Sequence, residues 1–180
     1  MRERKTPAQR PVIRDEVERD AAAVRGLLQQ AFDSPVEASI VDALRLACPD
    51  RISLVADHEG EVGGHILFTP VEIDGAAGRV RGYGLAPLAV RPDLQRRGLG
   101  SALVQAGLAR VREAGAPFVL VIGHPTYYPR FGFGPASRHG VRCQWPDIPD
   151  EAVMLLVLDA GGSLALAGEA RYRAEFDAAG

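Results

Sequence analysis

Residues 95–101 form the stretch whose residue types and spacing could bind an anion. They read Gln-Arg-Arg-Gly-Leu-Gly-Ser and lead from an apolar segment directly into a long helical pattern. The first amides of a helix have no partner within it, and the helix dipole adds about half a positive charge there. Gly98 and Gly100 lack a Cβ, so the backbone can approach phosphate oxygens closely. The stretch therefore predicts a diphosphate site, to which charge and a hydroxyl are added by Arg96, Arg97 and Ser101.

The same glycines have two other interpretations. A glycine pair beside a helix start can simply let a helix and a strand pack closely. A dinucleotide-binding Rossmann loop would need the pattern Gly-x-Gly-x-x-Gly and an acidic residue after the next strand. Leu103 and His124 occupy those two positions, so the residues disfavour a Rossmann loop.

The elements that must position this loop follow from the spacing of apolar residues. Apolar runs predict strands over residues 12–14, 53–57, 62–73, 85–90, 118–122, 141–145 and 152–158. Helical spacing predicts helices over residues 20–32, 35–46 and 98–114, and Ser34 is expected to be the N-cap of the second helix. We expect a short helix or turn over residues 127–131 and a loop over the glycine- and alanine-rich residues 74–81.

The strand, helix and strand around the loop form one crossover unit. Strands 85–90 and 118–122 are therefore expected to be parallel. Pro87 lies within the first of these strands. Because proline removes a donor from the hydrogen-bond ladder, it implies a bulge or a place where neighbouring strands have parted.

The bulk composition indicates an ordinary globular protein. At 180 residues, with 47% hydrophobic and 24% charged residues, the chain is expected to form one domain. Residues 1–10 are charged and lack an apolar period, so they predict a flexible N-terminal arm before a domain over residues 11–180. A net charge of −2, with both signs interspersed, disfavours nucleic acid as a partner.

The sequence predicts neither a secretory signal nor a membrane span. The N-terminus lacks the apolar stretch of a signal peptide. The longest convincing apolar run, residues 152–158, is far shorter than the ~20 residues that cross a bilayer. Cys48 and Cys143 lie far apart, without metal-ligand spacing. We therefore expect reduced cysteines and a cytoplasmic protein.

The order strand, Gln-x-x-Gly-x-Gly, helix resembles the signature of the GCN5-related N-acetyltransferases. Three more segments are similar to the YhbS-like branch of that family, namely residues 64–68, residues 168–176 and the block His-Pro-Thr-Tyr-Tyr-Pro-Arg-Phe-Gly-Phe-Gly-Pro-Ala over 124–136. Together these segments extend over most of the chain. The resemblance implies an α/β (α+β) domain with a mixed, mostly antiparallel central sheet, a splayed parallel strand pair and flanking helices.

The resemblance also implies acetyl-CoA as cosubstrate and indicates which residues hold it. In the family the loop binds the pyrophosphate, which implies that role here for Gln95, Arg96, Arg97, Gly98, Leu99, Gly100 and Ser101. The pantetheine arm of the family's cosubstrate lies between the splayed strands. Backbone groups of Leu88, Ala89 and Val90 would hold it here, and an amide among them could stabilise the thioester oxygen. The implied reaction is direct attack by a neutral amine through a tetrahedral intermediate.

Tyr128 precedes Gly132 by four residues, as the general-acid tyrosine of the family does in its Tyr-x-x-x-Gly-Phe motif. The resemblance therefore implies that Tyr128 protonates the departing thiolate, and Tyr127 is its nearest competitor. The pKa of a thiol is about 8.5 and that of a phenol is about 10, so proton transfer from the tyrosine to the thiolate involves no large mismatch of pKa.

The general base is left open by the sequence, because residues 84–90 contain no carboxylate. The candidates are His65, Glu72, His124 and a water molecule. Glu37 is expected either to face the acceptor amine or simply to occupy the first turn of a helix, where its charge is favourable.

The acceptor and the assembly also stay open. The alternative function is a non-catalytic module that binds acyl-CoA for sensing or assembly, although Tyr128 favours catalysis. The donor could carry an acyl group longer than acetyl. A small amine, an amino acid, an antibiotic and a peptide are all candidate acceptors, and a homodimer is a candidate assembly. The segment after Leu158 either covers the acceptor pocket or forms a subunit contact through Leu164, Leu166, Tyr172 and Phe176.

Overall fold

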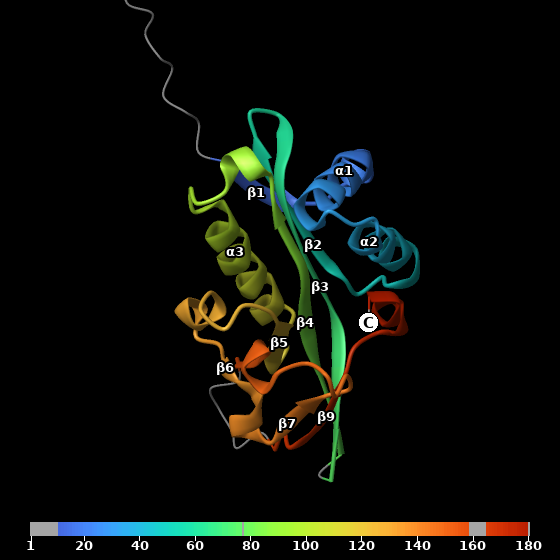
Figure 1. Cartoon of the computed structure of the whole chain (residues 1–180), viewed down its shortest axis with the longest axis vertical. Coiled ribbons are helices and arrows are strands. Elements are labelled where there is room, and N and C mark those ends of the chain that lie inside the picture. The colour runs from blue at the N-terminus through green and yellow to red at the C-terminus, as the bar shows by residue number, and fades with distance from the viewer. Residues whose placement is uncertain (1–10, 77, 159–164, 180) are drawn as a thin grey trace, which may run out of the picture.

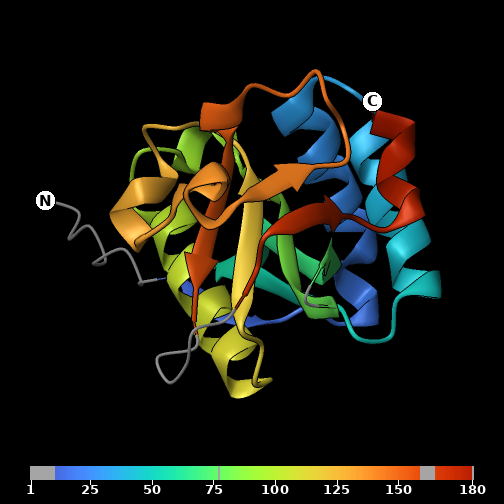
Figure 2. The same ribbon diagram turned by 90° about the horizontal axis from the view of Figure 1, so that it is seen from below.

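The computed structural model describes residues 11–76, 78–158 and 165–179, which form a central sheet with helices on both faces (Figure 1). Helices α1 (Ala21–Phe32) and α2 (Val36–Ala47) cover one face, and α3 (Leu99–Glu113) covers the other. Figure 2 shows the sheet from below, between these two helical layers. Each face buries its own apolar cluster, so the sheet separates two cores.

The sheet has nine strands among the described residues. In chain order they are β1 (Val12–Asp15), β2 (Ile52–His58), β3 (Glu61–Gly75), β4 (Gly78–Val90), β5 (Phe118–Ile122), β6 (Gly134–Pro135), β7 (Val141–Cys143), β8 (Val153–Val157) and β9 (Gly168–Arg171). The main order is β1-β2-β3-β4-β5-β8-β6, and β9 pairs with β3 and β7. Only β4–β5 and β7–β9 are parallel among these pairs, which confirms the mostly antiparallel sheet.

β3 and β4 form a long hairpin that extends beyond the rest of the sheet in Figure 1. The prediction of a loop over residues 74–81 is wrong, because Asp74 still pairs with Arg79 across the hairpin. β9 adds itself to the outer edge of β3 at residues 72–74. Arg79 also forms an ion pair with Asp74 at 2.6 Å. A partner strand from far along the chain thus outweighs the low strand propensity of the glycines.

The predicted parting of the strands at Pro87 is confirmed. β4 and β5 pair only over three positions, and the last of them joins Leu85 to Val121. On the other side of β4, the register with β3 shifts, so that Leu67 alone stands opposite Ala86 and Pro87. A bulge therefore lies where β4 leaves β5, and the carboxyl ends of the two parallel strands diverge.

The predicted start of the second helix differs slightly from the structure. We expect Ser34 as the N-cap, whereas α2 begins at Val36 and Pro35 is the cap residue. The Val36 N–H donates a hydrogen bond to Ser34 Oγ at 3.1 Å. The Ser34 hydroxyl accepts from the backbone N–H two residues ahead, as in a turn, and does not cap the helix as an N-cap side chain would.

The C-terminal segment folds back against the sheet beside α2. A 3₁₀ helix over Ala174–Ala179 follows β9 and lies next to α2 (Figure 1). Leu166, Tyr172 and Phe176 are buried in the core on that face. Leu164 and the predicted arm over residues 1–10 lie outside the described residues. In the described part of the chain, no helix combines the length and the apolar character that a membrane span needs.

Candidate active site

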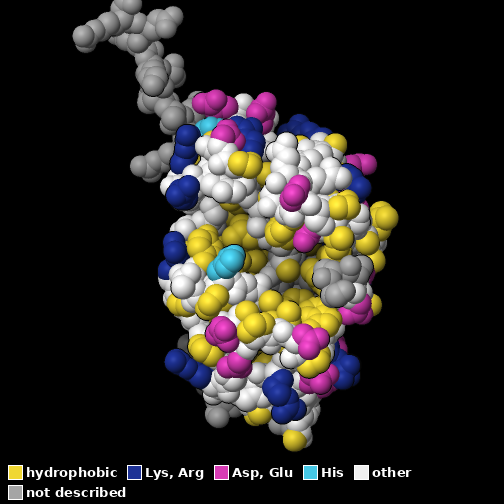
Figure 3. Space-filling model, in the orientation of Figure 1, with side chains coloured by type: hydrophobic (Ala, Val, Ile, Leu, Met, Phe, Trp, Pro, Cys, Tyr) yellow, Lys and Arg dark blue, Asp and Glu magenta, His cyan; other side chains and the backbone are white. Residues whose placement is uncertain are grey.

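A pocket of about 390 Å³ opens where β4 and β5 diverge. One wall consists of residues 85–88 of β4, and the opposite wall is formed by Ile122, Gly123, His124 and Tyr128. The side of α1, α2 and the C-terminal 3₁₀ helix contributes Phe32, Glu37, Ile40 and Phe176. Figure 3 shows hydrophobic side chains gathered around a hollow in the middle of this face. The pocket thus adjoins the free edge of β4.

The predicted anion loop connects β4 to α3. Arg96 and Gly98 have positive φ angles of 59° and 84°, so the backbone turns sharply before α3 begins at Leu99. Within the described part of the chain, the N–H groups from Arg96 to Ser101 have no protein acceptor. The side chains of Arg96 and Arg97 are exposed and form no ion pair with a described residue. A helix start of this kind can accept an anionic ligand.

Two kinds of contact hold the loop in place. Leu94 and Leu99, on either side of it, are 4% and 5% exposed and anchor it in the core beneath α3. The Gln95 side chain donates from Nε2 to the Val90 carbonyl at 3.1 Å. Gln95 thus ties the loop to the end of β4, and the side chain of Leu99 belongs to the core rather than to the surface of the loop.

The last residues of β4 have one free edge. Leu88, Ala89 and Val90 pair with β3, and no residue of β5 pairs with them on the opposite side. The Ala89 side chain is buried on the face of α1 and α2. Ala89 can therefore serve a ligand along this open edge only through its main-chain groups, whereas Leu88 also lines the pocket.

Tyr128 lies at the pocket on a short 3₁₀ helix, Tyr128–Phe131. Its side chain is 8% exposed and packs edge-on against Tyr127 and Phe133, with centroid distances of 5.1 and 5.7 Å. A Cβ on Gly123 would come within 2.4 Å of the Tyr128 ring, so only glycine leaves room for it. Burial raises the pKa of Tyr128, which keeps the phenol protonated but makes it a weaker acid than a free tyrosine.

Tyr127 occupies a different place from Tyr128. A Cβ on Gly100 would lie 3.0 Å from the Tyr127 hydroxyl, which puts that hydroxyl at the start of α3. The Arg130 guanidinium lies 4.6 Å from the centroid of the Tyr127 ring, in a cation–π contact. The two adjacent tyrosines therefore separate, with Tyr127 at the anion loop and Tyr128 at the pocket.

The structure separates the three candidate bases. His65 is fully buried and does not line the pocket, so it cannot act there as a base. Glu72 lies on the far part of the β3–β4 hairpin, where it forms an ion pair with Arg79 at 3.1 Å. His124 is exposed and lines the pocket. His65 and Glu72 are therefore excluded as direct bases, and His124 is the candidate that the fold brings to the pocket.

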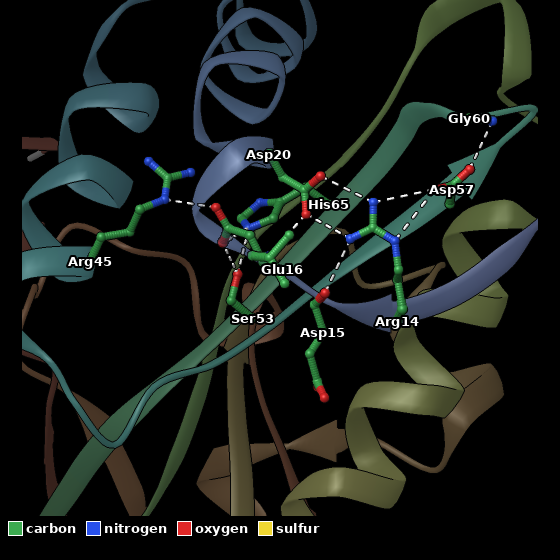
Figure 4. A network of polar contacts seen from close by, with 10 residues as sticks. Arg14, Asp15, Glu16, Asp20, Arg45, Ser53, Asp57, Gly60 and His65 are labelled. Carbon is green, nitrogen blue, oxygen red and sulfur yellow. Dashed lines mark hydrogen bonds and ion pairs between the residues drawn. The ribbon is translucent and has the colours of Figure 1, made fainter.

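His65 belongs instead to a polar cluster between the sheet and α2, which we call the Glu16 cluster (Figure 4). Its Nε2 lies 2.9 Å from Ser53 Oγ, and Ser53 donates to the carboxylate of Glu16. Arg45 Nε also donates to Glu16 at 2.7 Å. Burial lowers the pKa of His65, so we infer a neutral imidazole that donates from Nε2 to Ser53.

Sequence reasoning missed several groups around the pocket. Phe32 and Ile40 were not assigned to it from the sequence, because they come from elements that only the fold brings together, whereas Phe176 belongs to the C-terminal segment expected either to cover the pocket or to form a subunit contact, and it does line the pocket. The buried Oε2 atom of Glu37 has no hydrogen-bond partner among the described residues. The sequence pointed to Glu37 only through its place near the start of the predicted second helix.

Comparison with known proteins identifies the family. A model of the acetyltransferase (GNAT) domain matches residues 12–136. The uncharacterized N-acetyltransferase YhbS of Escherichia coli K12 is 40% identical over 136 residues, which cover 75% of this chain and 80% of that protein. The crystal structure of Escherichia coli YhbS in complex with CoA has a TM-score of 0.87 at 35% identity, covering 97% of this chain and 96% of that one.

A second solved structure agrees. A GNAT family acetyltransferase from Brucella melitensis in complex with acetyl-CoA has a TM-score of 0.75 at 36% identity, covering 93% of this chain and 98% of that one. The splayed strands, the loop before α3 and these matches together show that the chain belongs to the GNAT acetyltransferase family.

Proposed function

We propose that this N-acetyltransferase takes an acetyl group from acetyl-CoA and passes it to a primary amine in the pocket between β4 and β5. The observation that carries the proposal is the row of N–H groups from Arg96 to Ser101, which lack acceptors among the described residues. They lie at the start of α3 beside two exposed arginines, and this arrangement suits a diphosphate. The relatives crystallised with CoA and acetyl-CoA support the same cosubstrate.

The loop and the free edge of β4 would bind different parts of the cosubstrate. The N–H groups of Arg96, Arg97, Gly98, Leu99, Gly100 and Ser101 would bind the pyrophosphate, while Gln95 holds the loop against β4. The open edge of Leu88, Ala89 and Val90 would bind the pantetheine arm as an added strand. A backbone N–H at this edge would stabilise the negative charge that develops on the thioester oxygen.

Acetyl-CoA supplies the activated acetyl thioester, and the protein supplies the proton transfers. An ammonium substrate must lose one proton before it attacks and a second one as the C–N bond forms and the C–S bond breaks. His124 would accept the first proton and pass it to solvent. Tyr128 would donate a proton to the departing thiolate and be reprotonated with the second. The net reaction yields an acetamide, free CoA and one proton.

Two measurements test this proposal separately. Titration of the purified chain with CoA, followed by calorimetry, should show saturable binding. Release of free thiol from acetyl-CoA, measured across a panel of amines, should show turnover with at least one of them. Binding without turnover across a broad panel would favour the non-catalytic module, and absence of binding would overturn the proposed role of the loop.

The remaining finer assignments are also proposals. We propose an acetyl rather than a longer donor, a cytoplasmic location, a domain over residues 11–180 and a homodimer as the assembly to be tested. Cys48 and Cys143 are both free thiols, which fits the predicted reduced state. Sedimentation of the purified chain would measure the assembly directly.

A further inference from the structure

A second cavity adjoins the pocket and shares lining residues with it. This cavity has a volume of about 440 Å³ and shares Ala86, Ile122 and Phe176 with the first. Its far wall includes Trp145 and Tyr172. Because the two cavities share three lining residues, they are adjacent, and an amino group in the first lies next to space for a larger body in the second.

The second cavity has an aromatic wall. The rings of Trp145 and Tyr172 lie 5.4 Å apart and are tilted by 32°, and the Tyr172 and Phe176 rings meet edge-on at 5.6 Å. Burial of Tyr172 and Phe176, each 8% exposed, holds this wall in place. An apolar, planar group would gain hydrophobic and ring–ring contacts against it.

Glu37 is the only carboxylate among the described residues that line the first pocket. Its Oε2 atom is buried, and neither an ion pair nor a hydrogen bond joins Glu37 to another described residue. A buried carboxylate oxygen without a partner is costly, and a cation with N–H donors would satisfy it. Among the residues that the structure describes, no lysine or arginine lines either cavity and could take that place.

From this arrangement we propose that the acceptor is a primary amine carried on an aromatic group, with its ammonium held by Glu37 and its ring in the cavity of Trp145. This inference rests on the proposed acetyl transfer and names its acceptor class. Glu37 and His124 line the same pocket, so an ammonium bound by Glu37 lies where His124 can remove its proton. Asp147 and Tyr172, whose hydroxyl has no hydrogen-bond partner among the described residues, are the polar residues that line the second cavity. The other described lining residues there are apolar, so most hydroxyls of a polyhydroxylated amine would face apolar walls, and such an amine is disfavoured.

Trp145 is the only tryptophan in the chain, so its fluorescence reports on the second cavity without any need for turnover. Phenethylamine is the probe, excited at a wavelength that its ring does not absorb. We expect a saturable change in Trp145 emission with phenethylamine. We expect a change at only ~10-fold or higher concentration with phenethyl alcohol, which has the same ring but no charge.

Two matched variants test the role of the carboxylate. Glu37→Gln removes the charge at the pocket and should weaken phenethylamine binding ~10- to 100-fold, while the affinity for CoA stays unchanged. Glu18→Gln removes the charge of an exposed glutamate outside the pocket and should leave both affinities as they are. Equal binding by Glu37→Gln and the wild-type chain would overturn the inference, and CoA binding shows that each variant is folded.

A turnover assay distinguishes this inference from the proposed function. With acetyl-CoA present, we expect kcat/KM for phenethylamine to exceed that for glucosamine by ~10-fold or more, and Glu37→Gln to raise KM for the amine. Turnover that favours glucosamine would leave acetyl transfer standing and overturn the aromatic acceptor. Binding of phenethylamine that depends on Glu37, without any turnover, would support the amine site and contradict acetyl transfer.

Discussion

The Glu16 cluster and the pocket each place a glutamate beside the sheet, but the two carboxylates differ in whether the protein itself satisfies them. In the cluster, Glu16 receives hydrogen bonds from Ser53 and Arg45, and His65 bonds to Ser53. At the pocket, the buried Oε2 atom of Glu37 has no hydrogen-bond partner among the described residues.

This difference separates a stabilising network from a binding site. The bonded carboxylate of Glu16 holds neighbouring elements in a fixed arrangement, because it joins the β1–α1 connection to Arg45 of α2 and Ser53 of β2. Polar groups left without partners beside a cavity cost stability unless a ligand completes them. We therefore expect the activity to depend on the pocket, and the stability at acid pH to depend on the Glu16 cluster.

The largest expected effect is that of Tyr128→Phe, which removes the hydroxyl and keeps the ring. Without the general acid, kcat should fall ~100-fold or more, while the affinity for CoA stays the same. Tyr127→Phe is the matched control, because its hydroxyl lies beside Gly100. We expect it to alter KM for acetyl-CoA rather than kcat in steady-state assays. A greater loss of kcat in Tyr127→Phe would assign the acid role to Tyr127.

His124→Asn should lower kcat/KM roughly 10- to 100-fold, because water then has to remove the amine proton. His139→Asn changes an exposed histidine that does not line the pocket, and it should have no effect. Steady-state rates of thiol release measure both variants. Equal rates in His124→Asn and the wild-type chain would leave a water molecule as the base.

Gly100→Ala should weaken CoA binding about 10-fold, because the added methyl group would lie 3.0 Å from the Tyr127 hydroxyl at the anion loop. Gly26→Ala is the control, since its Cβ would meet nothing within 4 Å inside α1. That control should leave CoA affinity unchanged and raise the free energy of unfolding by about 0.5–1 kcal/mol. Calorimetric titration with CoA compares the two variants.

Glu16→Gln should have the smallest effect on activity and a clear effect on acid stability. Burial alone would raise the pKa of Glu16, but hydrogen bonds from His65 and Ser53 and the positive charge of Arg45 outweigh it and lower the pKa from 4.5 to about 2. A depressed pKa in the folded state stabilises the protein above pH 4.5, and that contribution is lost as the pH falls toward about 2.

The wild-type chain should therefore lose roughly 2–3 kcal/mol of unfolding free energy through this group between those two pH values. Glu16→Gln should be less stable at pH 7 and should lose this part of the pH dependence, while kcat changes less than about twofold. Urea unfolding of both chains between pH 3 and pH 7 measures the free energy of unfolding and its pH dependence. An unchanged acid transition in the variant would show that the cluster does not set acid stability.

Much of the candidate site was predictable because its signals are local. A glycine pair before a helical pattern predicted the loop, and α3 does begin at Leu99 after the positive φ of Gly98. Pro87 predicted the parting of strands for a local reason, the missing donor. The cosubstrate contacts of these residues stay predictions, whereas the family resemblance is confirmed.

Other features could not be predicted because they depend on which distant segments meet. The sequence alone could not choose among His65, Glu72 and His124 as the general base. The fold buries His65, places Glu72 on the far part of the β3–β4 hairpin and brings His124 to the pocket. The strand structure of residues 74–81 likewise depends on pairing between β3 and β4, to which the distant β9 adds a partner at residues 72–74.

Local backbone preference and side-chain chemistry depend on residues that are close together in the chain. The sequence by itself therefore determined the helices, most strands, the predicted anion loop and the family. Burial and hydrogen-bond partners are properties of segments far apart in the chain, so only the tertiary structure decided that Glu37 lacks a partner and that Trp145 and Phe176 line cavities next to it.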